Sequence, residues 1–395
     1  MGHFDVPSLA GFCALIGAFV KIIYFANTDW YLYNFRLNLA QAMRERGDEV
    51  VLMSPPGEYA KRLQAAGFRW ISFPLSRKGV NPLIEMGVVN RLTRVYIQEK
   101  PDLVHHFTVK CVTYGSLAAK RAGVPHVVNS VTGLGHVFVE NGFSVKLLRL
   151  VVRGLYRKAM RGTQVIFQNP DDQRLFQEMR LVSEAQSVLI RGSGIDMNRF
   201  VPLPEPETST PLVVLPARII WNKGIGEFVE AAHILRGDGV PARFALVGVT
   251  DSGNPASVSL MQLGDWQKEG VVEWWGWQED INVVFALAHI ICLPSYREGV
   301  PRVLVEAAAC SRALVATDVP GCREIVRDGE NGFLVPPRDA YALAEALRKL
   351  LKDAHLRRKM GQRGREIVEA EFSTSRVISE TIAVYDHLLQ NKAAG

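Results

Sequence analysis

Two glutamates eight residues apart are the first candidates for chemistry in the sequence. Glu298 lies in a polar loop, SYREGV, that follows an apolar run, and Glu306 lies in a helix that we expect to begin at Pro301. The N–H groups of a first helical turn, here around Val303 and Leu304, have no acceptor within the helix and can bind a diphosphate. Carboxylates accept hydrogen bonds from several hydroxyls. The pattern therefore suits a sugar or ribose bound beside phosphates, although most glutamate pairs at this spacing are a solvated loop residue and an ordinary helix residue.

Two cations in the second half of the chain strengthen this interpretation. Arg218 follows the strand-like run LVVLPA, and Lys223 stands just before the next expected helix. Arginine offers a bidentate fork and lysine a point charge, and both bind phosphate oxygens. Either residue alone would be an ordinary surface charge. Together with the later loop, they predict a diphosphate site at the carboxyl edge of a sheet.

Alternating strand-like and helix-like runs position these residues. They predict an α/β protein of the doubly wound kind, with two Rossmann-like domains whose parallel sheets are covered by helices on both faces. The expected strands are residues 21–27, 48–53, 68–73, 102–107, 125–131 and 163–168, then 212–217, 243–248, 271–276, 289–294 and 313–318. Ligands bind at the carboxyl ends of such strands, so we expect the site in a cleft that the two domains face.

The alternation breaks once, near the middle of the chain. Residues 201–211, VPLPEPETSTP, contain four prolines and no apolar periodicity, which is typical of an interdomain linker. We therefore expect an N-terminal extension over residues 1–20, one domain over 21–205, a second over 206–372, and a C-terminal helix over 373–395 that returns toward the first domain.

Composition excludes several classes of protein. The chain has 395 residues, of which 48% are apolar and 22% charged, and this excludes intrinsic disorder. Its five cysteines form no C-x-x-C pair and predict no zinc site. Residues 1–200 carry 25 Lys and Arg against 15 Asp and Glu, whereas residues 201–395 carry 21 against 25. A basic first half suggests an anionic partner: lipid headgroups, a phosphate-bearing substrate or nucleic acid.

The N-terminus is ambiguous. Residues 9–20 are apolar, but the preceding residues carry no Lys or Arg, as a signal peptide would require, and Lys21 ends the run before it could span a bilayer. We expect either a membrane-contacting element or an extension without a role.

At this point the sequence resembles a known family. The order of its motifs is similar to that in the retaining family-4 glycosyltransferases. Along the chain these motifs are R-x4-K-G, a glycine loop at Gly276, S-x2-E-G and then E-A, and G-x2-E-x4-G-x2-G from Gly321 to Gly332. The resemblance implies the GT-B fold. It is greatest to bacterial N-acetylgalactosaminyltransferases and related enzymes that extend a sugar on undecaprenyl diphosphate.

The resemblance implies roles for these residues. Arg218 and Lys223 would neutralise the donor diphosphate, Glu298 would lie near the donor sugar, and Glu306 would hold the ribose hydroxyls. Gly299 and the amides of Val303 and Leu304 would complete the site. The second domain would then bind a nucleotide-sugar, expected to be UDP-linked, and the first an acceptor. No metal or other cofactor is expected, because Arg and Lys do the neutralising.

The first domain departs from the family pattern. The usual Gly-Gly turn after the first strand is replaced by NTDWYLYN, so Asn27 and the aromatic residues after it should form a different wall. The histidine common after the fifth strand is replaced by Thr132 in SVTGLGH, which makes Thr132, Gly133 and His136 candidates. Lys110 is a candidate phosphate or acceptor contact. For all of these, an ordinary surface or loop residue is the alternative, and for the adjacent His105 and His106 a hydrogen-bonded core histidine is favoured.

A basic stretch lies between the candidate loops. Residues 143–162 repeat arginine every four residues beside an apolar face, which suits a helix on an anionic membrane surface. The alternative is a helix packed on its own sheet with a solvated basic stripe.

Taken together, we expect a retaining hexosyltransferase, peripheral on the cytoplasmic face of the inner membrane. It would transfer a sugar, expected to be an N-acetylhexosamine, from a nucleotide donor to a polyprenyl-diphosphate-linked glycan in cell-surface polysaccharide or glycoprotein assembly. A nucleotide-sugar 2-epimerase of the same fold, or a transferase with a soluble acceptor, are the alternatives. A dehydrogenase would need G-x-G-x-x-G after an opening strand, and a nucleic-acid-binding protein a recognition motif; neither occurs.

Overall fold

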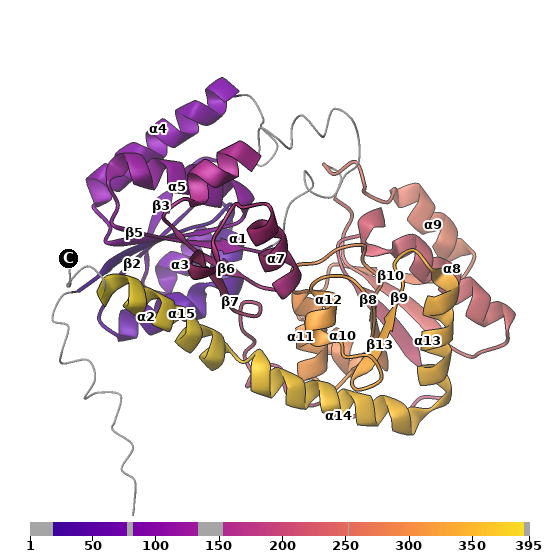
Figure 1. The fold of residues 1–395 in the computed structure, drawn as a ribbon. Coiled ribbons are helices and arrows are strands. Elements are labelled where there is room, and N and C mark those ends of the chain that lie inside the picture. The colour runs from indigo at the N-terminus through magenta and orange to yellow at the C-terminus, as the bar shows by residue number, and fades with distance from the viewer. Residues whose placement is uncertain (1–18, 77–81, 133–152, 252, 391–395) are drawn as a thin grey trace, which may run out of the picture. The chain divides into compact units, whose positions relative to one another are not determined.

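The computed structural model of the protein describes residues 19–76, 82–132, 153–251 and 253–390 (Figure 1). The expected extension over residues 1–20 lies almost wholly outside these ranges. The described residues form two compact units, each built around its own sheet. Unit 1 contains the residues up to Phe167, Gln173–Leu189, and those from Thr381 onward, and unit 2 contains Gln168–Asp172 and Ile190–Glu380.

Unit 1 contains a parallel sheet of seven strands in the order β3-β2-β1-β4-β5-β6-β7. The strands are β1 (Lys21–Phe25), β2 (Glu49–Ser54), β3 (Arg69–Ser72), β4 (Leu103–Phe107), β5 (His126–Val131), β6 (Gln164–Phe167) and β7 (Ser187–Leu189). The sequence predicted the first six but not β7, whose three residues are too few for a recognisable pattern. The described helices of this part of the chain are α1 (Asp29–Phe35), α2 (Leu37–Glu45), α3 (Ala60–Ala65), α4 (Pro82–Glu99), α5 (Val109–Ala122) and α7 (Pro170–Glu178).

Strand burial in unit 1 follows from helices on both faces of the sheet. All five residues of β4 are buried, and so are the last five of β2, because a parallel sheet covered on both sides has no solvent face. The final helix, α15 (Thr374–Gln390), contributes to this core through its C-terminal half, where Tyr385 is fully buried.

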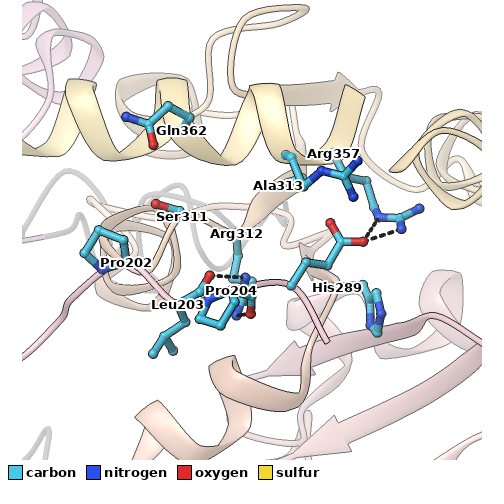
Figure 2. A pocket seen from close by; sticks show the side chains of 11 residues that line it. Pro202, Leu203, Pro204, His289, Ser311, Arg312, Ala313, Arg357 and Gln362 are labelled. Carbon is cyan, nitrogen blue, oxygen red and sulfur yellow. Dashed lines mark hydrogen bonds and ion pairs between the residues drawn. The ribbon is translucent and has the colours of Figure 1, made fainter. Parts of the chain in front are cut away.

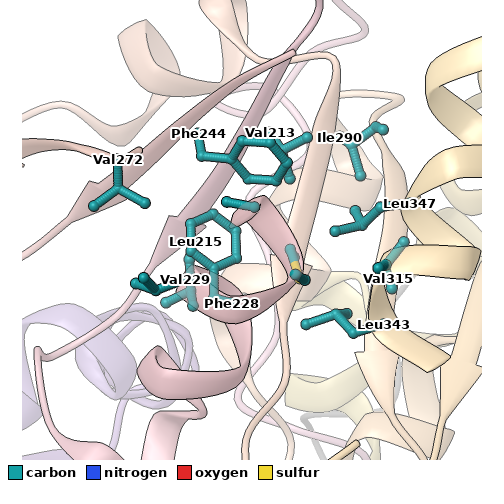
Figure 3. Close-up of a cluster of buried hydrophobic side chains, with 14 of the residues drawn as sticks. Val213, Leu215, Phe228, Val229, Phe244, Val272, Ile290, Val315, Leu343 and Leu347 are labelled. Atoms are coloured by element: carbon teal, nitrogen blue, oxygen red, sulfur yellow. The ribbon is translucent and has the colours of Figure 1, made fainter. Parts of the chain in front are cut away.

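Unit 2 has the six-strand order β10-β9-β8-β11-β12-β13, again parallel. The strands are β8 (Leu212–Pro216), β9 (Arg243–Val247), β10 (Glu273–Gly276), β11 (Ile290–Leu293), β12 (Ala313–Thr317) and β13 (Gly332–Val335). The helices are α8 (Ile225–Gly237), α9 (Leu260–Lys268), α10 (Ile281–Leu287), α11 (Arg302–Ala309), α12 (Cys322–Ile325), α13 (Ala340–Lys352) and α14 (Ala354–Glu371). Figure 3 shows part of the core, in which Leu215 and Val315 of the sheet face Phe228 of α8 and Leu343 of α13.

The strand order of unit 2 creates the place where a ligand can bind. From β8 the chain moves outward to β9 and β10, then returns to pair β11 with the other side of β8, with Val213 opposite Ile290. The connections after β8 and β11 therefore leave the sheet in opposite directions, which opens a crevice at their carboxyl ends. The segments that open this crevice carry Lys223 and Glu298.

The proline-rich segment that the sequence suggested as a linker is bound to unit 2. We call residues 200–206 the strap. Arg312, only 2% exposed, donates to the carbonyl oxygens of Leu203 (3.0 Å) and Pro204 (2.8 Å), and Arg357 of α14 pairs with Glu205 (Figure 2). A pocket of about 260 Å³ lies beside the strap, between it, His289 and the start of β12. The strap thus forms part of the wall of unit 2, away from the carboxyl ends of β8 and β11.

None of the described helices is both long enough and apolar enough to cross a membrane.

Candidate active site

The turn after β8 is held against the end of β11 by a glycine. Residues Trp221–Lys223 form one 3-10 turn, and Gly224, with φ of +73°, ends it and begins α8. A β-carbon on Gly224 would lie 2.1 Å from the carbonyl oxygen of Pro294, where no side chain fits. This close approach brings Lys223 next to the loop that follows β11.

Hydrogen bonds fix the two segments to each other. The N–H of Tyr296 donates to the carbonyl of Asn222 at 3.0 Å, and the Tyr296 hydroxyl donates to Glu227 of α8 at 2.8 Å. Burial raises the pKa of Tyr296 to about 12, with the Glu227 carboxylate adding to the effect, so the phenol remains a donor. Tyr296 and Glu227 were not among the residues that the sequence singled out, because no motif marks either of them.

Lys223 and Glu298 meet in this loop pair. The Lys223 ammonium donates to the Glu298 carboxylate, and their side chains are only 20% and 12% exposed. The structure thus brings together one predicted cation and one predicted carboxylate at the carboxyl ends of the two central strands. An ammonium and a carboxylate so placed can bind an anion and a hydroxyl-rich group side by side.

Arg218 lies on the same connection but has a different partner. It follows β8 directly, its side chain is 56% exposed, and its guanidinium pairs with Asp251 at 3.2 Å. In this exposed position the pair contributes little to stability. The guanidinium is therefore available to an anionic ligand that displaces the Asp251 carboxylate.

Helix α11 carries the second predicted carboxylate. Pro301 is the N-cap and the helix begins at Arg302, one residue later than expected. Glu306 pairs with Arg302 at 2.7 Å. Burial raises the pKa of Glu306, and the positive charge of Arg302 opposes the rise. In the first turn the Leu304 N–H donates to the Pro301 carbonyl at 3.0 Å, which leaves Val303 as the better placed of the two predicted amide donors.

Gly299 and Gly321 show why this loop needs glycine. A β-carbon on Gly321, whose φ is +82°, would lie 1.8 Å from the Gly299 carbonyl oxygen. Glu324 of the same motif pairs with Arg191 at 2.8 Å, and a β-carbon on Gly332 would lie 2.2 Å from the Leu314 carbonyl oxygen. The residues of this motif therefore support the Glu298 loop and the adjacent strands by close packing.

The candidates of unit 1 lie at the ends of its strands. Asn27 follows β1 and Thr132 follows β5. Lys110, in the first turn of α5 after β4, donates to Glu85 and to the Ser76 carbonyl, each at 2.9 Å. His136 and Gly133 lie outside the described residues. β1 and β4 are neighbours at which the strand order reverses, so Asn27 and Lys110 are on connections that open a second crevice.

The segment NTDWYLYN is partly helical, where a loop was expected. Thr28 caps α1 by accepting from the Tyr31 N–H at 3.1 Å, and the buried Asp29 carboxylate accepts from the Ala60 N–H at 2.9 Å. Trp30 remains 39% exposed. The aromatic wall that the sequence suggested is thus carried by a short helix whose start is fixed by two polar side chains.

His105 and His106 are both core residues. His105 bonds to Tyr385 (2.5 Å) and Ser130 (2.7 Å), and His106 bonds to Tyr96 (3.0 Å) and Asn129 (2.9 Å). Burial lowers both pKa values, that of His106 to about 4. Strand alternation places their side chains on opposite faces, but both faces are covered, so neither is free for catalysis.

The described part of the basic stretch begins at residue 153. Arg153 donates to the carbonyl of Met179 at 2.7 Å, and Arg157 donates to that of Arg180 at 3.2 Å. These carbonyls follow the end of α7, where cations are favourable. Two arginines of the stretch therefore stabilise a helix end within unit 1, and residues 143–152 lie outside the described part.

Comparisons with known proteins agree with this architecture. Residues 21–169 match the family model described as glycosyl transferase 4-like, and residues 210–353 match that of glycosyl transferases group 1. An N,N'-diacetylbacillosaminyl-diphospho-undecaprenol alpha-1,3-N-acetylgalactosaminyltransferase of Campylobacter jejuni is 29% identical over 385 residues, which cover 94% of this chain and all of the relative.

Two more distant similarities point the same way. An Escherichia coli UDP-Gal:alpha-D-GlcNAc-diphosphoundecaprenol alpha-1,3-galactosyltransferase is 24% identical, over 71% of this chain and 74% of its own. The crystal structure of Anabaena HepE in complex with UDP matches with a TM-score of 0.75 at 19% identity, over 93% of this chain and all of HepE. The two parallel sheets and these matches confirm the expected GT-B fold. The chain belongs to the glycosyltransferases, with a 4-like first domain and a group 1 second domain, and is an enzyme of the hexosyltransferase class.

Proposed function

We propose that the protein transfers an N-acetylhexosamine from a UDP-sugar to a glycan linked to a polyprenyl diphosphate, with retention of anomeric configuration. The observation that carries this proposal is the Lys223–Glu298 pair at the carboxyl ends of β8 and β11. The Campylobacter relative is named for a diphospho-undecaprenol acceptor, and it matches this chain over nearly its whole length.

In the proposed mechanism, the cations act on the donor diphosphate. Lys223 exchanges its Glu298 partner for a phosphate oxygen, and Arg218 leaves Asp251 to do the same. The N–H of Val303, at the start of α11, is a further donor for the diphosphate. Because the negative charge on the leaving diphosphate grows during transfer, donors fixed in place before the reaction lower its barrier.

The carboxylates act on hydroxyl groups. Glu298, released from Lys223, accepts hydrogen bonds from the donor sugar, and Glu306 accepts them from the ribose. The acceptor hydroxyl attacks the anomeric carbon, the bond from that carbon to the diphosphate breaks, and a donor phosphate oxygen takes the hydroxyl proton. Arg and Lys neutralise the diphosphate in this scheme, so we propose that no metal ion is needed.

We further propose that unit 1 binds the acceptor and that the enzyme acts at the cytoplasmic face of the inner membrane. Its first 200 residues carry ten more basic than acidic side chains. Burial lowers the pKa of Lys120, and the positive charges of Arg161 and Lys158 nearby lower it further, so three basic side chains lie close together here. Such a cluster favours an anionic surface. Binding to vesicles containing anionic lipid, weakened by salt and absent for neutral vesicles, would support this location.

The proposed reaction is tested by screening UDP- and GDP-sugars for donor hydrolysis, then for transfer to a short polyprenyl-diphosphate sugar. Product linkage by NMR gives the anomeric configuration, and excess EDTA should leave the rate unchanged. Incubation with the donor alone distinguishes transfer from 2-epimerisation. Transfer to a free sugar at the same rate as to the lipid-linked one would contradict the proposed acceptor.

A further inference from the structure

A short segment from the first half of the chain is part of the candidate site in unit 2. Gln168–Asp172 follows β6 and contains the start of α7, and its contacts assign it to unit 2 although the residues on both sides belong to unit 1. Two of its side chains, Asn169 and Asp172, are each only 1% exposed. Buried polar side chains need partners, and those partners lie on the Glu298 loop.

Asn169 binds the backbone beside Glu298. Its Oδ1 accepts from the Asp172 N–H at 2.8 Å, and its Nδ2 donates to the Asp172 Oδ2 at 3.0 Å and to the carbonyl of Gly299 at 3.2 Å. Gly299 is the residue that follows Glu298. The amide thus orients Asp172 and fixes the chain on one side of the catalytic candidate.

Asp172 binds the residue on the other side. Its Oδ1 accepts from the Arg297 guanidinium at 2.5 Å, and the Arg297 side chain is 29% exposed. Burial raises the pKa of Asp172, and its bonds to Asn169 and Arg297 oppose that rise. A buried carboxylate that has lost its cation would be strongly unfavourable, so the pair holds Arg297 in one orientation.

These contacts fix the neighbours of Glu298 and leave its carboxylate to pair with Lys223. Arg297 and Gly299 are held by the same segment, and Gly321 packs closely against the Gly299 carbonyl. The Glu298 carboxylate itself accepts from Lys223. Because a buried ion pair contributes little net stability compared with apolar packing, what this arrangement mainly supplies is a fixed orientation of the loop around Glu298.

We infer that Asn169 and Asp172 are positioning residues for the transfer reaction: they hold Arg297 and Gly299 so that the carboxylate of Glu298 faces Lys223 and the donor sugar. The inference rests on the proposed function, because it assumes that Glu298 acts on the donor. Neither residue touches substrate in this scheme, and both act through Glu298.

The first test compares two neighbouring carboxylates. Asp172→Asn removes the charge that holds Arg297. Asp171→Asn is the control: it removes a carboxylate that is 26% exposed and pairs with Arg323 at 3.2 Å. Arg323 also pairs with Asp318 at 2.6 Å, so it retains a carboxylate partner in the control variant. We expect Asp172→Asn to lower kcat at least tenfold and to leave the Kd for UDP, measured by calorimetry, within about threefold. Asp171→Asn should stay within about twofold of wild type in both.

The second test asks whether Asp172 acts through Glu298. Asp172→Asn should lower single-turnover transfer strongly in the wild-type background and not at all in the Glu298→Gln background, because residues that act as a unit are not additive. An equal fall in both backgrounds would show a general structural effect and overturn the inference. Arg297→Lys, which keeps the charge but loses the fork, should show a smaller fall with the same dependence on Glu298.

The outcomes separate the two proposals. If the wild-type enzyme transfers sugar and Asp172→Asn matches Asp171→Asn, the positioning role is wrong and the proposed function stands. If the wild-type enzyme transfers no sugar from any donor tested, both fail. Thermal unfolding of every variant identifies losses of fold, and Arg297→Lys supplies the coupling measurement if Asp172→Asn does not fold.

Discussion

The ammonium of Lys223 lies against the carboxylate of Glu298, although 75 residues separate them in the chain. They meet because β8 and β11 are neighbours in the sheet and because Gly224 lets the first turn approach the end of β11. Each charge is mostly shielded from water, so each fixes the other. A donor that enters this site finds both groups already in place.

Removal of either partner should abolish most activity without loss of fold. Lys223→Ala and Glu298→Gln should each lower kcat about 100- to 1000-fold, the range found when a preorganised charge-stabilising group is removed. Lys268→Ala is the matched control, since that side chain is 82% exposed. Steady-state transfer and thermal unfolding check the expectation. Turnover near that of the control in both variants would mean that the site has been assigned to the wrong residues.

Gly224 should be far less tolerant than a glycine with open space around it. In Gly224→Ala the new methyl would collide with the Pro294 carbonyl, and the residue would keep a left-handed conformation. We therefore expect the free energy of unfolding to fall by more than about 2 kcal/mol and transfer activity to be lost. Gly264, within α9, has no neighbour within 4 Å of the added methyl, and Gly264→Ala should gain about 0.5–1 kcal/mol. Urea unfolding distinguishes them; similar stabilities would contradict this account.

Ser311 occupies a position that favours glycine. Its φ is +58°, and its buried hydroxyl oxygen has no hydrogen-bond partner among the described residues. Ser311→Gly should therefore stabilise unit 2 by about 1 kcal/mol, or a midpoint rise of about 2–4 °C in thermal unfolding. Ser311→Ala, which removes the unpartnered hydroxyl but keeps the β-carbon at a positive φ, should bring a smaller gain. Equal midpoints for the two variants would show that backbone strain is not the cause.

Acid should destabilise unit 1 through its buried histidines. The pKa of His106 is about 4 in the folded chain, below its ordinary value of 6.5, so the unfolded chain binds the proton more tightly between these values. The contribution of His106 to the free energy of unfolding is therefore fully present above pH 6.5. As the pH falls toward 4, about 3 kcal/mol of it is lost. Burial lowers the pKa of His105 as well, which adds to the loss.

Urea unfolding between pH 7 and pH 4.5 measures this dependence. In His106→Gln the free energy of unfolding should depend less steeply on pH, by up to about 1.4 kcal/mol per pH unit, which is the effect of one proton. His233→Gln is the control, because that side chain is 43% exposed beside Glu269. An unchanged slope in His106→Gln would assign the acid sensitivity to other groups.

The sequence was sufficient to predict both parallel sheets and the edge at which Lys223 and Glu298 meet. Strands buried on both faces appear as short apolar runs, and the residues after β8 and β11 lie at a predictable edge of the sheet. Lys223 and Glu298 could therefore be placed there as candidates, and their role stays a prediction. The strand β7 was missed because a run of three residues is too short to show an alternating pattern. Helix α1 was missed because its aromatic residues were interpreted as a loop and the capping residue Thr28 was not recognised.

Contacts between distant segments could not be predicted in the same way. Asn169 and Asp172 form an N-x-x-D pattern after a strand, and this spacing indicates only the start of a helix. Their bonds to Gly299 and Arg297 depend on where that helix lies in three dimensions. Lys110 and Arg218 were predicted as phosphate-binding candidates, but their ion pairs with Glu85 and Asp251 could not be predicted, since those carboxylates come from other elements.

The strap has a consequence for dissecting the molecule. Carbonyl oxygens of Phe200, Leu203 and Pro204 accept from arginines of unit 2, and Glu205 neutralises another. Cutting the gene at Pro211, one residue after the second family match begins, would remove these acceptors. The two outer nitrogens of Arg312 would then lose the partners that they have in the strap, while its Nε keeps the Phe285 carbonyl. An autonomous C-terminal fragment should therefore start upstream of Phe200, and one that starts downstream should precipitate when expressed.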